Sequence, residues 1–181
     1  MKKLIYVVLL FLCFQCSQEP FELRKKEFSI TFPNNWKEIR IKGIDSKVYG
    51  VQTNKRDTII LDYGLYSKNF KKTIKVFSRE QIKKYDSLEM DTEDLKWSDT
   101  PDIDQNQAIF HNSYYYYDTI NKEMGRVKVP KIGHRGITGI SFRNINGSDK
   151  NLTIYVRDIS YEEQKLLLKS FKTIKFINGI D

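Results

Sequence analysis

The sequence predicts an α+β fold, an antiparallel β-sheet covered by two or more short helices, one of them near the C-terminus. Many short segments alternate apolar and polar residues, which is the period of a half-buried strand. Two segments carry a serine followed three residues later by Gln or Glu, the pattern of a helix capping box. Aromatic residues make up 13% of the chain, and strands favour aromatic side chains. Strands that outnumber helices, with the clearest helix near the end, favour a sheet covered by helices.

The first half of the predicted domain forms an antiparallel meander. Phe28, Ile30 and Phe32 alternate with polar neighbours, so they share one face of a strand. The turn that follows this strand leads to Trp36, which we expect to be buried. The predicted elements are strands at 27–32, 39–41, 48–53 and 58–66, with turns at 33–35 and 54–57.

The first helix begins where Ser78 and Gln81 form a capping box, and we expect it to end near Leu88. The next stretch, residues 89–104, is acidic and irregular. Pro101 lies within it and is expected to break any helix there.

The second half returns to strands and ends in the clearest helix. The longest strand carries four consecutive tyrosines, Tyr114 to Tyr117, of which we expect one pair to pack in the core and the other to face solvent or a covering element. We expect cross-strand packing of these side chains, and binding of a sugar or peptide by exposed tyrosines is the alternative. A second capping box, Ser160 with Glu163, begins a helix whose apolar residues lie on one face. The predicted strands are 107–119, 126–129, 137–143, 152–157 and 173–177, with a turn at 121–125 and a loop at 130–136.

The N-terminus has the features of an export signal. Lys2 and Lys3 form a basic head, and Leu4 to Phe14 is an unbroken apolar run. A helix that crosses a bilayer needs about 20 apolar residues, so the run is too short to span a membrane. Its length and basic flank are typical of a secretory signal.

The run ends at Cys13-Phe14-Gln15-Cys16, which resembles a bacterial lipoprotein lipobox of the Bacteroidetes kind. The resemblance implies that the cysteine is lipidated, the preceding peptide is removed and the new N-terminus is acylated. A typical lipobox has leucine three residues before the cysteine and a small residue just before it, where this chain has Cys13 and Gln15. We favour Cys16 over Cys13 as the acceptor, because polar residues begin there. A cleaved signal without a lipid is the alternative.

This interpretation divides the chain into three parts. They are a signal peptide at 1–15, the lipidated cysteine with a spacer at 16–26, and one globular α+β domain at 27–181. Two or more acyl chains hold a protein stably on a membrane, so the lipid membrane is the first expected partner. We expect the protein to be exported and anchored in the cell envelope, at the outer membrane.

Composition limits the chemistry of the mature domain. Both cysteines lie in the signal region, so the domain has no disulfide, no thiol nucleophile and no thiolate metal site. The formal net charge is +8, but no basic run is dense enough to predict nucleic-acid binding. We expect no metal and no cofactor.

Two segments at the ends of the domain resemble PsbP-like domains. They are the opening Phe28 to Trp36 and the Lys169-Ser170-Phe171-Lys172 of the closing helix. The resemblance implies an α-β-α sandwich and a binding or assembly role, because that family is not principally catalytic. No functional residue carries over from it.

One loop is a candidate anion site. Lys128, Lys131, His134 and Arg135 cluster around two glycines of the 130–136 loop. Exposed backbone N–H groups with neighbouring cations favour a phosphate, a carboxylate or a lipid headgroup. The alternative is a solvated hairpin connection.

Catalytic and metal-binding motifs are weaker. The chain contains no nucleophile-elbow pattern of the Gly-x-Ser-x-Gly type. Asp102-x-Asp104-x-Asn106 begins like a calcium loop but lacks the glycine and the carboxylate that an EF-hand needs, so we interpret it as a solvated acidic loop. His111 and His134 are interpreted as hydrogen-bonding histidines.

These observations predict a non-catalytic, membrane-anchored lipoprotein of the cell envelope that acts as a binding or assembly module for a protein, sugar or peptide. An envelope hydrolase with dispersed catalytic residues is one alternative, and it predicts a deep cleft around His111 or His134. An immunity or inhibitor lipoprotein is the other, and it predicts a flat binding patch without a pocket.

Overall fold

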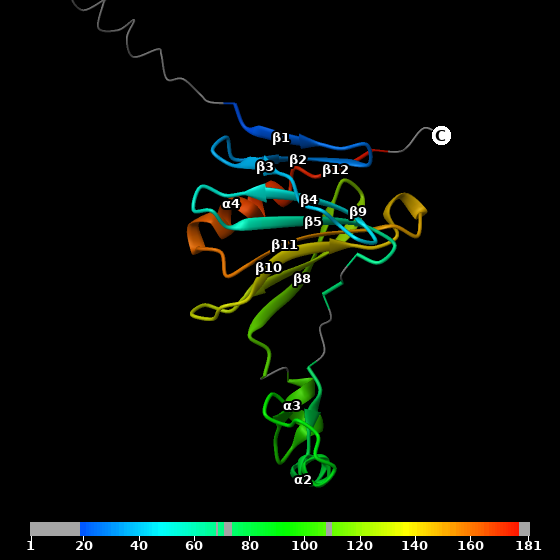
Figure 1. The fold of residues 1–181 in the computed structure, drawn as a ribbon, viewed down its shortest axis with the longest axis vertical. Coiled ribbons are helices and arrows are strands. Elements are labelled where there is room, and N and C mark those ends of the chain that lie inside the picture. The colour runs from blue at the N-terminus through cyan, green and yellow to red at the C-terminus, as the bar shows by residue number, and fades with distance from the viewer. Residues whose placement is uncertain (1–18, 68, 71–73, 108–109, 178–181) are drawn as a thin grey trace, which may run out of the picture.

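The fold is α+β, as the sequence predicts, and its centre is a seven-stranded antiparallel sheet (Figure 1). The computed structural model describes residues 19–67, 69–70, 74–107 and 110–177. In spatial order the strands of this large sheet are β3 (Lys37–Ile39), β4 (Lys47–Gln52), β5 (Thr58–Gly64), β11 (Asn151–Arg157), β10 (Ile137–Phe142), β9 (Glu123–Pro130) and β8 (Ser113–Ile120). A 3-10 turn, η1 (Ile145–Gly147), connects β10 to β11.

A three-stranded antiparallel sheet and one helix pack against the inner face of the large sheet. The small sheet has the order β1 (Phe21–Arg24), β2 (Phe28–Phe32) and β12 (Lys175–Phe176), and the helix is α4 (Tyr161–Phe171). Phe28 of β2 packs edge-on against Tyr49 of β4, and Leu167 of α4 is completely buried in the same core. The core therefore lies between the large sheet on one side and the small sheet with α4 on the other.

The spacer predicted for residues 16–26 is wrong in its last part. Phe21–Arg24 forms β1, which pairs antiparallel with β2, and Leu23 is only 1% exposed. The charged residues of this segment, Glu22 and Arg24, are exposed on the other face of the strand. The burial of Leu23 and the strand hydrogen bonds stabilise an extended strand where charge alone suggested a free linker.

The two predicted capping boxes have different outcomes. At α2 (Arg79–Ser87) the Ser78 hydroxyl accepts the Gln81 N–H, and the Gln81 side chain accepts the Ser78 N–H. At α4 the Ser160 hydroxyl caps no backbone N–H. Glu163 is instead 5% exposed and accepts a hydrogen bond from the backbone N–H of Lys55, at 3.1 Å. A tertiary contact with the β4–β5 hairpin thus replaces the local cap.

The strand predicted over 107–119 is shorter than expected at its start. A short helix, α3 (Pro101–Asn106), occupies the preceding stretch, and the Gln107 N–H still bonds to the Ile103 carbonyl at 2.9 Å. Pro101 stands in the first turn of α3, where its missing N–H costs nothing, so it begins a helix and does not break one. Residues 108–109 lie outside the described part of the chain. The final strand, predicted over 173–177, is the two-residue β12.

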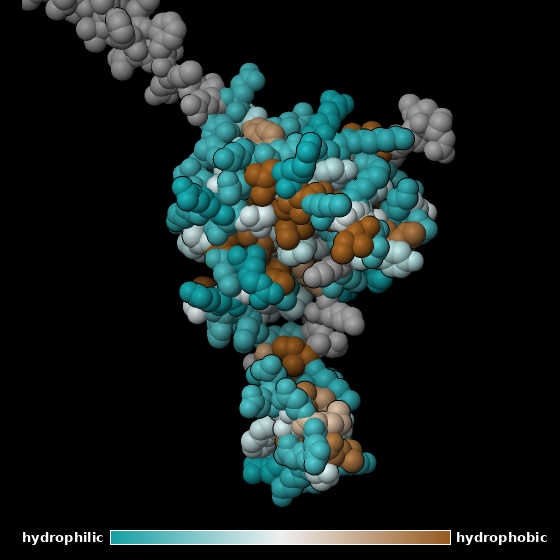
Figure 2. All heavy atoms as spheres, viewed as in Figure 1, coloured by the Kyte–Doolittle hydropathy of each residue, from teal (hydrophilic) through white to brown (hydrophobic). Residues whose placement is uncertain are grey.

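The helices α2 and α3 lie in a lobe, residues 75–107, that projects from the end of the body opposite β1 (Figure 1). Two short strands of the lobe pair in parallel: β6 (Val76–Phe77) precedes α2, and β7 (Lys96–Trp97) lies between α2 and α3. The lobe has five basic and nine acidic side chains, a net charge of −4. It also carries hydrophobic surface (Figure 2) from the exposed side chains of Leu88, Met90, Trp97 and Ile103.

No helix in the described part of the chain is long and apolar enough to cross a membrane.

Candidate functional site

Strand β8 is an edge strand of the large sheet and carries the four consecutive tyrosines. It is paired with β9 on one side only, and none of the other described strands pairs with its outer edge. Asn121 and Lys122 turn the chain between the two strands with φ angles of 48° and 71°. Two consecutive positive φ angles are typical of the two-residue turn that matches the twist of a hairpin. This turn fixes which β9 residue stands opposite each tyrosine.

The tyrosines alternate between the two faces of the sheet. Tyr115 and Tyr117 stand opposite Lys128 and Arg126 on the outer face. Tyr114 and Tyr116 lie on the inner face, where Tyr116 stands opposite Val127, a core residue that is 1% exposed.

The prediction that one tyrosine pair packs in the core is wrong. Tyr114, Tyr116 and Tyr117 are 56%, 43% and 59% exposed, and Tyr115 is half-buried. The core cluster extends to Val127 on β9 but includes β8 only at Ile120. An edge strand has no neighbouring strand on its outer side, so its large side chains stay in contact with solvent.

Three cations lie over tyrosine rings of β8. The distances from the charged group to the ring centroid are 5.3 Å for Arg126 and Tyr117, 5.6 Å for Lys128 and Tyr115, and 6.0 Å for Lys131 and Tyr114. All three fall within the range of a cation–π interaction. We call Tyr114 to Tyr117 with Arg126, Lys128 and Lys131 the tyrosine edge.

Arg126 is the best-fixed cation of the tyrosine edge. Its Nη2 donates to the Tyr117 hydroxyl at 2.6 Å, and its Nη1 donates to the Phe70 carbonyl at 2.9 Å. Hydrogen bonds from a charged donor are stronger than neutral ones. The guanidinium is thus held in one orientation above β8.

The inner side of the tyrosine edge is bound to the end of α4. Lys172, the C-cap residue of α4, forms an ion pair with Asp118 of β8. Burial raises the pKa of Tyr116, the Asp118 carboxylate raises it further, and Lys172 lowers it. Tyr116 is therefore a neutral phenol at physiological pH.

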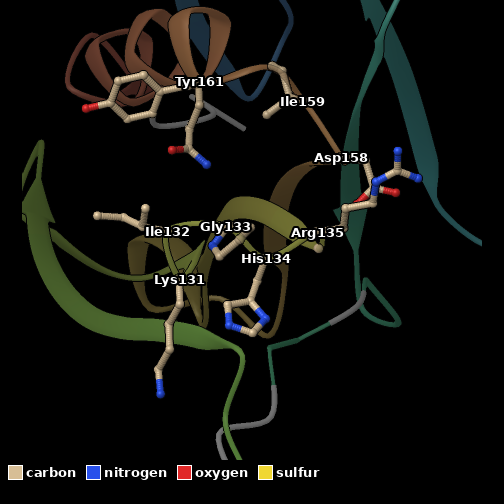
Figure 3. A pocket seen from close by; sticks show the side chains of 11 residues that line it. Lys131, Ile132, Gly133, His134, Arg135, Asp158, Ile159 and Tyr161 are labelled. Atoms are coloured by element: carbon tan, nitrogen blue, oxygen red, sulfur yellow. The ribbon is translucent and has the colours of Figure 1, made fainter.

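The predicted anion loop borders a groove, about 420 Å³ in volume, next to the N-terminus of α4 (Figure 3). Ile132 in the loop and Tyr161 on the helix are 93% and 64% exposed and give the groove an apolar component. Its lining comprises Pro130, Lys131, Ile132, Gly133, His134, Arg135, Gly136, Asp158, Ile159, Tyr161 and Gln164.

The four predicted anion-binding residues do not converge on one point. In Figure 3 the side chains of Lys131 and His134 extend away from the helix, whereas Arg135 lies toward Asp158. Lys128 does not line the groove and lies over Tyr115, on the opposite face of the hairpin from Lys131. Two of the four cations are therefore parts of the tyrosine edge.

The two histidines lie in different surroundings. His111 is 9% exposed, and its ring meets Tyr115 edge-on with the centroids 5.9 Å apart. His134 is in the exposed 130–136 loop, and its N–H donates to the Lys131 carbonyl. The groove that His134 borders does not include His111.

The acidic segment predicted as a solvated loop is helical around Asp102 and Asp104, in the first turn of α3. The Asp104 carboxylate accepts a hydrogen bond from the Thr100 hydroxyl at 3.2 Å. Within the described ranges, no three acidic, histidine or cysteine side chains are arranged to hold a metal ion.

A pair of carboxyl groups links the β4–β5 hairpin to α4. Burial raises the pKa of Asp57, and a hydrogen bond with the Glu163 side chain raises it further, while Lys55 lowers it. Asp57 therefore retains its proton to higher pH than an isolated aspartic acid does. Neither residue lines the groove.

The predicted lipidation site, Cys16, and its alternative, Cys13, lie outside the described residues. No protein-family model matches the chain, and no curated protein is significantly similar to it.

From the sequence, Lys128 and Lys131 were predicted as anion-binding residues and the tyrosines as part of one strand, but Arg126 and the pairing of these cations with the tyrosines were missed. The signal was present in the spacing. In a hairpin with a two-residue turn at 121–122, residues that face each other are equally far along the chain from the turn. This spacing pairs Tyr117 with Arg126 and Tyr115 with Lys128. The broader predicted turn at 121–125 did not define this register.

Proposed function

We propose that this protein is a lipid-anchored lipoprotein of the cell envelope, acylated at Cys16, that acts as a non-catalytic binding module. Its tyrosine edge binds an anionic region of a partner protein. Acylation would account for the export signal and for a cysteine placed at the end of the apolar run. The PsbP-like resemblance agrees with a binding or assembly role and stays a prediction.

The observation that carries the proposal is the exposure of the tyrosines together with their cations. Aromatic rings with polar tips and arginine side chains are enriched where proteins bind one another. The tyrosines of β8 contribute contact area and lose little side-chain conformational entropy when a partner binds. Positive charge comes from Arg126, Lys128 and Lys131. Such a surface favours an anionic partner.

The position of the surface supports the same function. The described chain begins beside β1, at one end of the long axis, and the lobe lies at the other end (Figure 1). β8 is the margin of the large sheet opposite β3. A lipid attached a few residues before β1 would leave the start of β8, at the lobe end of the body (Figure 1), farther from the membrane than the β8–β9 turn, where the Asn121 side chain donates to the Phe176 carbonyl of β12.

An inhibitor or immunity lipoprotein would use the same surface. The exposed tyrosines of β8 supply the protein-binding surface that this second function requires. It differs from simple binding only in that the bound partner loses its activity.

Binding of poly-glutamate to the mature chain tests the proposal. We expect salt-dependent binding that weakens at least threefold in the Arg126→Gln, Lys128→Gln double variant, because that variant loses the charge on the outer face. The control is the Arg135→Gln, Lys150→Gln double variant, which removes the same two charges at exposed positions outside the tyrosine edge and which we expect to change affinity by less than about twofold. Equal weakening in both variants would show that only the overall charge matters, and would contradict the proposal.

A further inference from the structure

We infer that an extended acidic segment of the partner protein adds to the outer edge of β8 as an eighth strand of the large sheet. This inference rests on the proposed function, since it specifies how the tyrosine edge holds its partner.

The outer edge of β8 is not paired with any other described strand. The strand has eight residues, and β9 pairs with it from Ser113 to Ile120. Alternate N–H and C=O groups of a strand point to opposite sides, so half of those on β8 point away from β9. Added strands in protein recognition form their main-chain hydrogen bonds with such groups.

β8 is less protected against an added strand than the edge strands β3 and β1. Proteins protect such margins by keeping them short or by placing charged residues or proline on them. β3 has three residues, of which two are charged, and β1 has four residues, of which two are charged. β8 is twice as long as β1, has only Asp118 as a charged residue and contains no proline or lysine.

Two positive charges lie next to the outer edge of β8. The amine of Lys128 and the guanidinium of Arg126 lie over rings that belong to β8, although both residues are on β9. A new strand would lie about 4.8 Å from β8. Acidic side chains on its outer face would then fall beside Tyr115 and Tyr117, next to these charges.

Outside the lobe the molecule is positively charged, which favours an acidic partner over a second copy of the chain. Apart from residues 1–15 and the lobe, the chain has 24 basic and 14 acidic side chains, a net charge of +10. A second copy of β8 on this edge would bring its own Arg126 and Lys128 close to the first pair. Like charges across an interface disfavour association, so an acidic segment fits the edge better than a second copy.

The test uses blocked eight-residue peptides with alternating Glu and Val and the full mature chain. The alternation fixes which face of the peptide is acidic, and a one-residue shift would reverse it. In one version the amides of the even positions are N-methylated, and in the other those of the odd positions. Each version therefore lacks the N–H groups along one edge only.

We expect the unmodified peptide and one methylated version to bind with similar affinity, and the other version to bind at least tenfold more weakly. The Arg126→Gln, Lys128→Gln double variant should bind the unmodified peptide at least threefold more weakly than the parent chain. Equal affinities for both methylated peptides would overturn the strand addition, while binding of poly-glutamate would leave the proposed function standing.

Tighter binding of polygalacturonate than of the peptide would also overturn the inference, because it would make the tyrosine edge a polysaccharide surface. Failure of poly-glutamate, the peptides and polygalacturonate alike would contradict the proposed function itself.

Discussion

The guanidinium of Arg126 lies over the ring of Tyr117 and donates a 2.6 Å hydrogen bond to the hydroxyl of the same residue. A second hydrogen bond from Arg126 reaches the Phe70 carbonyl, in the segment that follows β5. The Arg126 side chain thus connects β9 to the edge strand β8 and to the segment that contains Phe70.

Replacing Arg126 by Gln should lower the free energy of unfolding by about 1–2 kcal/mol, because the Phe70 carbonyl loses a charged donor. Tyr117→Phe keeps the ring under the guanidinium and should cost less than about 1 kcal/mol. Urea denaturation of the two variants measures both effects. A cost for Arg126→Gln no larger than that for Tyr117→Phe would show that the contact with Phe70 contributes nothing.

Strand β1 should contribute to stability as part of the core. Leu23 is 1% exposed, so Leu23→Ala should lower the free energy of unfolding by about 3 kcal/mol. Glu22→Ala, at the exposed neighbouring position, should change it by less than about 0.5 kcal/mol. If denaturation gave the same small change for both variants, the segment would be the free spacer that the sequence predicted.

The carboxyl pair of Asp57 and Glu163 should make stability depend on pH. Because the folded state raises the pKa of Asp57 above its ordinary value of 3.8, its contribution is present below that pH and is lost as the pH rises through the raised pKa. The stability of the parent chain, measured relative to Asp57→Asn, should therefore fall as the pH rises above 3.8. An amide donates to Glu163 without titrating.

The control for this measurement is Asp45→Asn, at an exposed position. Its stability should follow that of the parent chain at every pH. Parallel curves for the parent chain and Asp57→Asn would contradict the raised pKa of Asp57.

Acylation should depend on Cys16. Metabolic labelling with a fatty-acid analogue should mark the parent chain and Cys13→Ala, and should fail for Cys16→Ala. Labelling that survives Cys16→Ala but disappears in Cys13→Ala would move the anchor to Cys13. Complete absence of label would leave a cleaved signal without a lipid.

Local patterns predicted those parts of the fold that depend on neighbouring residues. The alternation of Phe28, Ile30 and Phe32 predicted β2, and all three side chains are at most 1% exposed. The capping box of Ser78 and Gln81 predicted the start of α2.

The features that depend on distant contacts were missed. β1 is a strand because β2 pairs with it, and Glu163 is buried because the β4–β5 hairpin supplies the Lys55 N–H. The exposure of Tyr116 follows from the strand order, which places β8 at the margin. The sequence contains every residue of the tyrosine edge, but its composition alone does not reveal which strand has only one neighbour.

Hydrogen exchange of the β8 backbone amides, measured by NMR with the alternating Glu-Val peptide present and absent, tests the central claim most directly. We predict that the peptide slows exchange at every second amide between Ser113 and Ile120, because only the outward N–H groups gain partners. Unchanged exchange along β8 while the peptide is bound would contradict the claim that this edge holds the partner.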